Sequence, residues 1–277
     1  MNERYLEFKG EKICYSVSGK GRAIVLLHGF LGSKEIFKKI ENKLSNRFKL
    51  VLIDLPGHGK SSCLGYVHTM EMMAQCVKAV LDHLQLRRYV LMGHSMGGYI
   101  SLAFAELFPD AIKGIGLINS SAYCDSEEKK KDRDRAIELV KKNSRVYSSN
   151  TIKNLFSEDN LEFKKSEILL ASKIALSTSK RGIIAALEGM KIRKERLIIL
   201  QHCKYPVLFI FGKKDNVLHF TTVKEQVKLV SSPSVLVLEN DGHMSFLENQ
   251  EICLNTISSF CRACFRGGKT KNTTSQL

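Results

Sequence analysis

The stretch "GHSMGG" at residues 93–98 decides how the rest of the chain is interpreted. It follows the apolar run "YVLM" and opens the apolar, helix-like stretch 96–108. Glycine weakens both strands and helices, so its use around a serine where a strand ends and a helix begins calls for an explanation. The spacing fits G-x-S-x-G, in which a nucleophilic serine stands on a sharp turn between a strand and a helix. We therefore predict that Ser95 is a nucleophile.

The glycines of this stretch have a steric explanation. Side chains at Gly93 and Gly97 would collide with the neighbouring strand and helix. Ser95 itself is expected in a strained backbone conformation, which costs on the order of 1–3 kcal/mol. G-x-S-x-G is a common pattern that often marks an ordinary turn, but the strand before it and the apolar helix after it favour a nucleophile.

Strand-like and helix-like segments alternate along the chain. Short apolar runs without polar alternation predict strands buried on both faces, as in a mostly parallel sheet. Strands and helices in alternation predict an α/β fold with right-handed crossovers. The expected strands lie at 5–9, 12–17, 23–30, 49–59, 89–95, 112–120, 206–215 and 234–243, and the expected helices at 70–84, 96–108, 220–230 and 248–265.

The alternation stops between residues 122 and 200, which read as helical and charged. Ordinary crossover helices are one interpretation, but a crossover needs only a dozen or more residues. We therefore expect residues 122–200 to form a helical cap inserted into a core made of residues 1–121 and 201–265. The polar, basic tail at 266–277 is expected to be disordered.

Composition limits the class of protein. The chain has 277 residues, 44% of them hydrophobic, which is enough for a sizeable core. No apolar run approaches the roughly 20 residues of a membrane helix, and the charged N-terminus does not resemble a secretory signal. We expect a soluble cytoplasmic protein without membrane insertion. The formal net charge of +15 is spread along the chain without interleaved aromatics, so we expect a solvated basic surface and no nucleic-acid partner. Nothing in the sequence indicates the oligomeric state.

The eight cysteines are scattered, and we expect them to be reduced. Cys261 and Cys264 form a lone CxxC pair. A zinc site needs more ligands, and no second pair or nearby histidine supplies them. We expect a helix end carrying two thiols and no metal.

A serine nucleophile needs a base held by an acid. His243, in "NDGHMSF", follows the last expected strand, and Asp215, in "FGKKDNVL", follows the strand before it. Sites in open α/β sheets form beyond the carboxyl ends of the strands, where Ser95 also lies. We therefore predict a catalytic triad of Ser95, Asp215 and His243.

Other assignments fit less well. Asn119 and Ser120 occupy the alternative position for the acid. Asp54 also ends a strand, but it opens "DLPGHGKS", which we interpret as a tight loop that shapes the floor of a pocket. Other histidines do not follow the last strand; they are His58, His68, His83, His94, His202 and His219.

Negative charge on the substrate oxygen needs hydrogen-bond donors. In "HGFLGS", Gly29 lets the backbone turn closely, so that the N–H of Phe30 faces the reacting carbonyl. The N–H of Met96, at the start of the helix after Ser95, is the second expected donor. The alternative interpretation of "HGF" is a tight turn with a core phenylalanine.

These motifs resemble the α/β-hydrolase superfamily. "LLHGFLGS", "DLPGHGKS", "GHSMGG", "GKKD" and "DGHMSFLEN" match its landmarks over about residues 3–265. The likeness is greatest to small esterases, cofactor-free haloperoxidase-like enzymes and C–C bond hydrolases. It implies a three-layer fold with a mostly parallel, roughly eight-stranded sheet and a helical cap. Because Ser95 stands where dehalogenases and epoxide hydrolases carry aspartate, those two activities are disfavoured.

The resemblance also implies acyl transfer to water without a cofactor. The first hypothesis is a hydrolase of carboxylic esters or thioesters with a small or medium acyl substrate. The alternatives are C–C bond hydrolysis or a lyase step with the same triad, and a non-catalytic ligand-binding protein. The sequence does not say which apolar cap residues face the pocket; the candidates are Phe156, Leu161, Leu169, Leu170, Ile183 and Met190.

Overall fold

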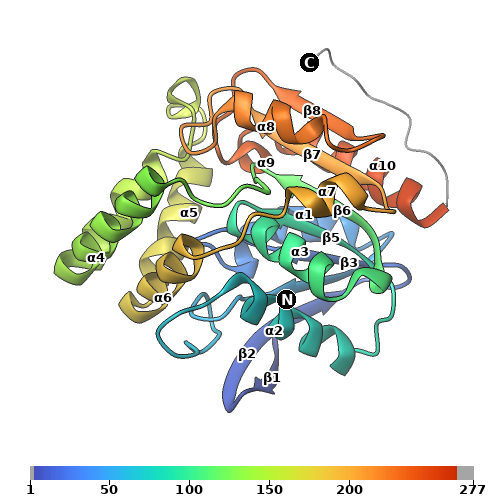
Figure 1. Cartoon of the computed structure of the whole chain (residues 1–277), viewed down its shortest axis with the longest axis horizontal. Coiled ribbons are helices and arrows are strands. Elements are labelled where there is room, and N and C mark those ends of the chain that lie inside the picture. The colour runs from blue at the N-terminus through green and yellow to red at the C-terminus, as the bar shows by residue number, and fades with distance from the viewer. Residues whose placement is uncertain (1–2, 267–277) are drawn as a thin grey trace.

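The computed structural model describes residues 3–266 and shows an eight-stranded sheet with helices packed against it (Figure 1). The strand order is β1-β2-β4-β3-β5-β6-β7-β8. The first two strands pair antiparallel, as do β2 and β4, and the remaining neighbours are parallel. This confirms the expected mostly parallel sheet. The strands are β1 (Glu3–Phe8), β2 (Glu11–Ser18), β3 (Ala23–Leu27), β4 (Lys49–Ile53), β5 (Tyr89–His94), β6 (Ile112–Ile118), β7 (Val207–Gly212) and β8 (Ser234–Leu238).

Every residue of the central strands β3, β5 and β7 is buried. Successive side chains of a strand point to opposite faces, so helices must cover both faces of the sheet. Helix α2 packs on α3, and α1 contacts α10. The larger helices are α1 (Lys38–Leu44), α2 (Met70–His83), α3 (Met96–Leu107), α4 (Glu127–Lys153), α5 (Lys165–Ser177), α6 (Lys180–Lys191), α7 (Leu197–His202), α8 (Phe220–Val227), α9 (Ser245–Glu248) and α10 (Gln250–Arg266); short 3₁₀ turns lie at Lys34–Phe37, Pro109–Ala111 and Glu158–Asn160.

The sequence explains where the two helices beside the central strands begin and how they pack. Helix α2 begins after Thr69, whose side chain accepts a hydrogen bond from the N–H of Met72, and it buries one apolar stripe that includes Val77 and Leu81. Helix α3 is buried over almost its whole circumference, as its apolar sequence predicted, and it ends before Pro109.

Helices α4, α5 and α6 are inserted between β6 and β7, where the charged segment predicted a helical insertion. Both α5 and α6 pack against α4, and Figure 1 shows the three helices gathered on one side of the molecule. Helix α4 has a kink at Asn143, where the backbone leaves helical geometry. Two ion pairs hold the insertion: Arg193 binds the buried Asp125 at 2.6 Å, and Arg196 binds Glu106 of α3 at 2.8 Å.

Cys261 and Cys264 lie in the last turns of α10 with buried thiols, as a helix end would place them. The expectation of a disordered tail concerns residues 266–277; Arg266 ends α10, and the rest of that segment lies outside the described residues. Between residues 3 and 266, no helix is both long enough and apolar enough to cross a membrane.

Candidate active site

Ser95 stands on the turn between β5 and α3. Its backbone has φ +50° and ψ −116°, the strained conformation expected from the motif. The turn is fixed on both sides of the residue, because the N–H of Ser95 donates to the carbonyl of Ile118 at 2.9 Å and the hydroxyl of Ser120 donates to the carbonyl of Ser95 at 2.8 Å.

The glycines on either side of Ser95 lie against backbone. A Cβ on Gly93 would lie 2.3 Å from the carbonyl oxygen of Gly97, and one on Gly97 would lie 2.2 Å from the carbonyl oxygen of Leu27. These separations are far below any van der Waals contact. The collisions expected from the sequence are therefore present, with the helix in the first case and the neighbouring strand in the second.

The structure brings Ser95, His243 and Asp215 together from the ends of β5, β8 and β7. Nε2 of His243 lies 2.8 Å from Oγ of Ser95, and Nδ1 lies 2.7 Å from Oδ2 of Asp215. An ionised carboxylate only accepts hydrogen bonds, so Nδ1 carries the proton and donates to Asp215. Nε2 then has a free lone pair and accepts the hydrogen bond of the Ser95 hydroxyl. This is the arrangement a general base requires.

Asp215 is buried and fully hydrogen-bonded. Its Oδ1 accepts from the N–H groups of Val217 and Leu218, and its Oδ2 accepts from Nδ2 of Asn119 at 3.0 Å. Burial alone raises the pKa of this carboxyl, but the His243 ring and the two N–H groups outweigh burial, and the net pKa lies below its usual value. Asp215 is therefore ionised at neutral pH.

Backbone contacts hold the His243 loop. The N–H of His243 donates to the carbonyl of Leu155, which lies just beyond α4, at 2.7 Å. Nε2 of His94 donates to the carbonyl of His243 at 2.9 Å, and Asn119 donates to the carbonyl of Gly242 at 3.0 Å. Burial, followed by the nearby His243 ring, lowers the pKa of His94 to about 3, so this imidazole is neutral.

Two unused N–H groups border Ser95. Within residues 3–266, the N–H groups of Phe30 and Met96 donate no hydrogen bond. Buried backbone donors are rarely left unpaired, and Met96 is fully buried. Gly29 allows the loop to approach closely, because a Cβ there would lie 2.6 Å from Nδ1 of His94 and 3.2 Å from Cβ of Ser95. These positions suit the two oxyanion donors expected from the sequence.

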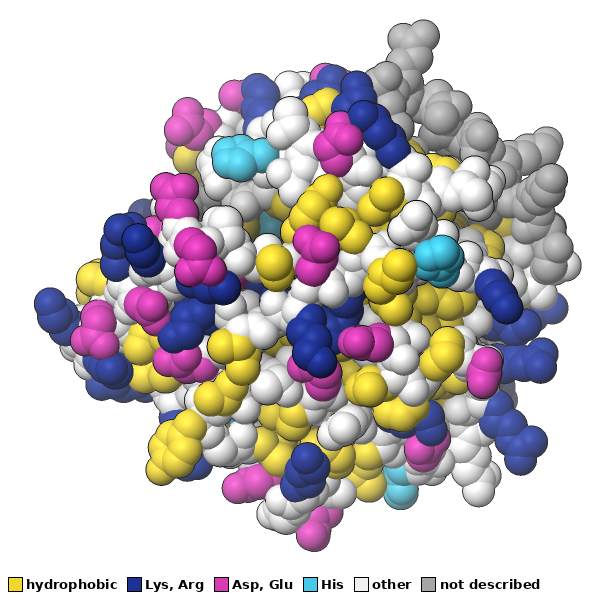
Figure 2. Space-filling view, in the orientation of Figure 1, with side chains coloured by type: hydrophobic (Ala, Val, Ile, Leu, Met, Phe, Trp, Pro, Cys, Tyr) yellow, Lys and Arg dark blue, Asp and Glu magenta, His cyan; other side chains and the backbone are white. Residues whose placement is uncertain are grey.

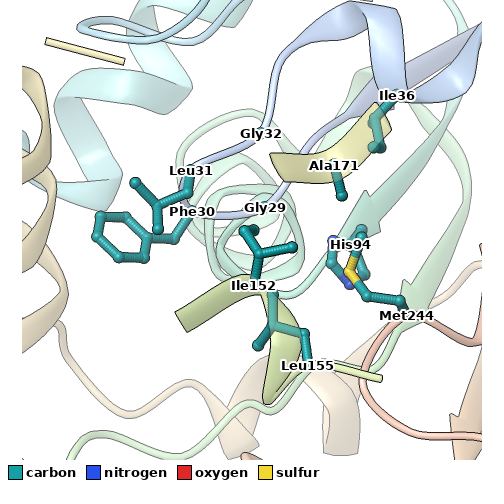
Figure 3. A pocket seen from close by; sticks show the side chains of 10 residues that line it. All are labelled: Gly29, Phe30, Leu31, Gly32, Ile36, His94, Ile152, Leu155, Ala171 and Met244. Carbon is teal, nitrogen blue, oxygen red and sulfur yellow. The ribbon is translucent and has the colours of Figure 1, made fainter. Parts of the chain in front are cut away.

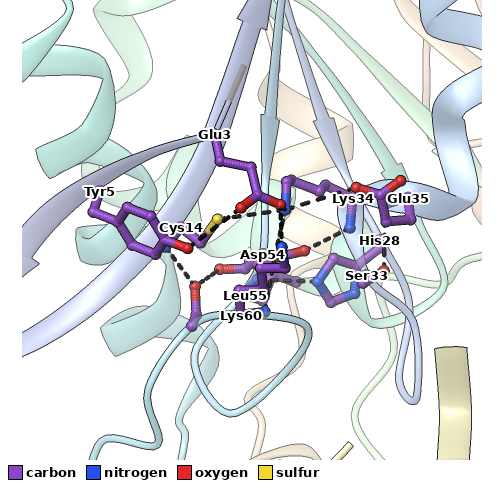
Figure 4. A network of polar contacts seen from close by, with 11 residues as sticks. Glu3, Tyr5, Cys14, His28, Ser33, Lys34, Glu35, Asp54, Leu55 and Lys60 are labelled. Carbon is purple, nitrogen blue, oxygen red and sulfur yellow. Dashed lines mark hydrogen bonds and ion pairs between the residues drawn. The ribbon is translucent and has the colours of Figure 1, made fainter. Parts of the chain in front are cut away.

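A buried polar network supports the loop that carries Phe30 (Figure 4). Oδ1 of Asp54 accepts from the N–H of Lys34 at 2.7 Å, and Oδ2 pairs with its ammonium at 2.9 Å. Burial alone lowers the pKa of Lys34, but Asp54 outweighs burial and raises it. In the same loop, His28 donates from Nδ1 to the carbonyl of Gly29 and accepts at Nε2 from the N–H of Leu55. Asp54 therefore anchors this loop.

A small cavity of about 20 Å³, lined by His94 and the Phe30 loop, lies between the insertion and the core (Figure 3). This volume holds about one water molecule. The insertion contributes Ile152, Leu155 and Ala171. The core contributes Gly29, Phe30, Leu31, Gly32, Ile36, His94 and Met244.

Two groups of residues that the sequence suggested for the pocket do not line this cavity. None of the six apolar candidates from the sequence lines this cavity; Leu169, for example, is exposed. A stripe of apolar residues in a charged helical segment does not show which face of the helix packs inward. The kink at Asn143 also changes the inward face partway along α4. No residue of the loop after Asp54 lines this cavity either.

The other histidines do not reach the Ser95 hydroxyl. His58 and His68 are buried beneath the loops, and burial lowers their pKa values to about 3 and about 4. The contacts of Asn119 with Asp215 and Gly242 were not predicted from the sequence. Asn119 was considered there only as a residue that occupies the alternative position for the acid. Its place directly after a strand of the sheet was the available signal.

A family model described as "alpha/beta hydrolase fold" matches residues 22–250. The chain belongs to the α/β hydrolase fold family. This α/β hydrolase is 29% identical over 254 residues to the AB hydrolase superfamily protein YisY of Bacillus subtilis (strain 168), covering 87% of this chain and 92% of the relative. It is 25% identical to Lipase 1 of Psychrobacter immobilis, covering 86% and 77% of the two chains.

Among solved structures, this α/β hydrolase is similar to a thermophilic esterase from Thermogutta terrifontis with malate bound. The TM-score is 0.90 and the sequence identity is 26%, and the likeness covers 95% of this chain and 99% of the esterase. This likeness agrees with the α/β hydrolase fold of this chain, with its eight-stranded, mostly parallel sheet and helical insertion α4–α6.

Proposed function

We propose that this α/β hydrolase cleaves carboxylic ester bonds through an acyl-enzyme on Ser95. His243 is the general base, Asp215 orients and stabilises it, and the N–H groups of Phe30 and Met96 bind the oxyanion. The observation that carries the proposal is the continuous hydrogen-bond chain from Ser95 through His243 to Asp215, at 2.8 and 2.7 Å.

The proposed reaction has two matching halves. Nε2 of His243 takes the proton of Ser95 as its Oγ attacks the substrate carbonyl, and the two N–H groups stabilise the resulting oxyanion. His243 then donates its proton to the leaving alkoxide, which departs as the alcohol. A water molecule repeats the attack on the acyl-enzyme, with His243 again as base, and Ser95 is regenerated as the acid leaves.

The comparisons support an ester substrate. The structural neighbour at 26% identity is named an esterase, and a sequence relative at 25% identity is named a lipase. The cavity is lined by apolar side chains such as Ile152, Leu155 and Met244, and it would have to widen to hold an acyl chain. Thioesters share the same chemistry. We further propose that residues 122–200 act as one cap over a core of residues 1–121 and 201–265.

A fluorophosphonate probe tests the nucleophile. We expect the wild-type protein to gain one phosphonyl group, located on Ser95 by mass spectrometry, and Ser95→Ala to gain none. Ser166→Ala, on the surface of α5, is the matched serine control and should label like the wild type. An unlabelled wild-type protein with native thermal stability would contradict the proposal.

Substrate panels test the bond that is cleaved. Nitrophenyl esters of increasing acyl length should be turned over, and acyl-CoA thioesters assayed beside them separate ester from thioester use. Labelling at Ser95 without turnover of the esters or the thioesters would instead favour C–C bond hydrolysis or a lyase reaction.

A further inference from the structure

Helix α4 exposes two large apolar side chains on its outer face. Leu139 is 56% exposed and Val146 is 54% exposed, on either side of the kink at Asn143. A shallow groove of about 320 Å³ runs between them and is also lined by Lys142 and Tyr147. Apolar side chains gathered in this way on a surface often mark an interaction site.

This exposed face continues onto the start of α6 and the loop before α2. The ammonium of Lys180, at the start of α6, donates to the carbonyl of Lys141 on α4. The guanidinium of the next residue, Arg181, lies over the ring of Tyr66 at 5.9 Å, and Tyr66 is 83% exposed. Three segments distant in sequence therefore lie side by side at the cap end of the molecule (Figure 1).

The charge of these segments has one sign. Residues 60–70, 139–157 and 177–187 contain no aspartate or glutamate. Lys142, Arg145 and Lys180 form no ion pair with any of residues 3–266. Glu138, directly before the second segment, is already paired with Lys141 at 2.7 Å. In the view of Figure 2, this end of the molecule carries hydrophobic side chains between Lys and Arg and between Asp and Glu side chains.

We propose that this face binds the surface of a membrane that contains anionic phospholipids. We call it the cap surface and define it by Tyr66, Leu139, Lys142, Arg145, Val146 and Lys180. Apolar and aromatic side chains that can enter the headgroup region, together with unpaired Lys and Arg, are the combination that an anionic bilayer binds. A partner protein with an acidic face would satisfy the cations but would not need a lone, highly exposed tyrosine beside them.

The cap surface is connected with the candidate active site through α4. The same helix supplies Ile152 to the cavity lined by Phe30 and His94, and Leu155 follows two residues after its end. A bilayer against the outer face of α4 would therefore hold amphiphilic esters close to the site. The binding proposal itself rests on the cap surface alone, so it stands even if Ser95 proves not to be a nucleophile.

Co-sedimentation of the full chain with vesicles tests the proposal. We expect binding to vesicles of phosphatidylcholine with phosphatidylglycerol, weaker binding to phosphatidylcholine alone, and loss of binding at high salt. The variant Lys142→Glu/Arg145→Glu should lower the partition coefficient by roughly 30-fold or more. The control Arg87→Glu/Arg88→Glu makes the same change in net charge between α2 and β5, and it should bind nearly as well as the wild type.

A second pair of variants tests the apolar contribution. Leu139→Ser/Val146→Ser should weaken vesicle binding by roughly tenfold, whereas Ile198→Ser/Ile252→Ser removes similarly exposed side chains elsewhere and should not. Thermal unfolding checks that all variants are folded. Equal loss of vesicle binding in a variant and its control would overturn the proposal, because net charge or nonspecific apolar contact would then explain the binding. The proposal would also be overturned if the wild-type protein did not bind anionic vesicles but formed dimers, and if Leu139→Ser/Val146→Ser abolished those dimers.

Discussion

The backbone N–H of His243 donates a hydrogen bond to the carbonyl oxygen of Leu155, at 2.7 Å. The first residue is the proposed general base, and the second belongs to the helical insertion and lines the cavity. The position of the imidazole therefore depends on the insertion as well as on the sheet. A change in how the insertion packs would alter the alignment of His243 with Ser95 even if every residue of the sheet stayed in place.

Glu248 is a second link between the insertion and the His243 loop. Its carboxylate accepts from the N–H of Ser157 at 2.9 Å, the N–H of Gly242 at 2.9 Å and Nδ2 of Asn160 at 2.8 Å. Glu248→Ala leaves buried donors unpaired, so we expect about 2–4 kcal/mol lower free energy of unfolding, measured by urea titration. Glu251→Ala, on the exposed side of α10, should change stability by less than about 0.5 kcal/mol.

Asp215 holds the tautomer of His243 on which general-base catalysis depends. In Asp215→Asn the side chain can donate toward Nδ1, which favours the tautomer with its proton on Nε2. We expect kcat to fall by roughly 10⁴-fold with little change in KM, the size of effect seen when a triad aspartate is replaced by asparagine. Steady-state kinetics with a nitrophenyl ester would measure this, and a fall of less than tenfold would argue against Asp215 as the orienting acid.

Gly29 keeps the Phe30 loop close to Ser95. The Cβ of an alanine would lie 2.6 Å from Nδ1 of His94, so the loop must move and carry the Phe30 N–H with it. We expect Gly29→Ala to lower kcat by about 100-fold, the typical effect of losing one oxyanion donor. Fluorophosphonate labelling and thermal unfolding distinguish this outcome from a misfolded protein. A kcat within twofold of the wild type would argue against the Phe30 N–H as an oxyanion donor.

Asp241 makes the stability of the protein depend on pH. Burial, followed by the Glu248 carboxylate, raises the pKa of Asp241 to about 6, while Lys164, Asn160 and Asn249 oppose this rise. The folded state thus binds more protons than the unfolded chain between about pH 4 and pH 6, where an unfolded aspartate is already ionised. Stability contributed by protonated Asp241 is full below that window and is lost as the pH rises through it.

Asp241→Asn should remove this dependence. Between pH 4 and pH 7 we expect the wild type to lose about 2 kcal/mol more unfolding free energy than the variant does. Urea titrations at several pH values measure the difference, and Asp110→Asn, on the surface after α3, serves as control. Parallel pH profiles for Asp241→Asn and the wild type would show that Asp241 titrates normally.

The sequence predicted the parts of the site that depend on strand ends. Ser95, Asp215 and His243 each follow an apolar run, and parallel strands bring their carboxyl ends to one edge, so their convergence follows from the chain order. Their catalytic roles stay predictions. Asn119 follows the same rule but carries no chemistry of its own that would have singled it out.

The inner face of the insertion was not predictable in the same way. Ile152 and Leu155, which line the cavity, lie beyond the bend of α4 at Asn143, and no proline or glycine marks that bend. The burial of Lys34 could not be predicted from the sequence either, since lysine is almost never fully buried unless it is paired. Its partner Asp54 comes from another strand end, and only the folded sheet brings the two together.

The cavity lined by Phe30, Leu155 and Met244 holds only about one water molecule, so it has no room for an acyl chain as it stands. An acyl chain could enter this cavity only if its lining from the insertion, Ile152, Leu155 and Ala171, moved outward first. If that opening is slower than acylation, esters with good and poor leaving groups would be consumed at nearly the same rate. Substrates would then be selected by size and shape as they enter the cavity, before Ser95 attacks the carbonyl.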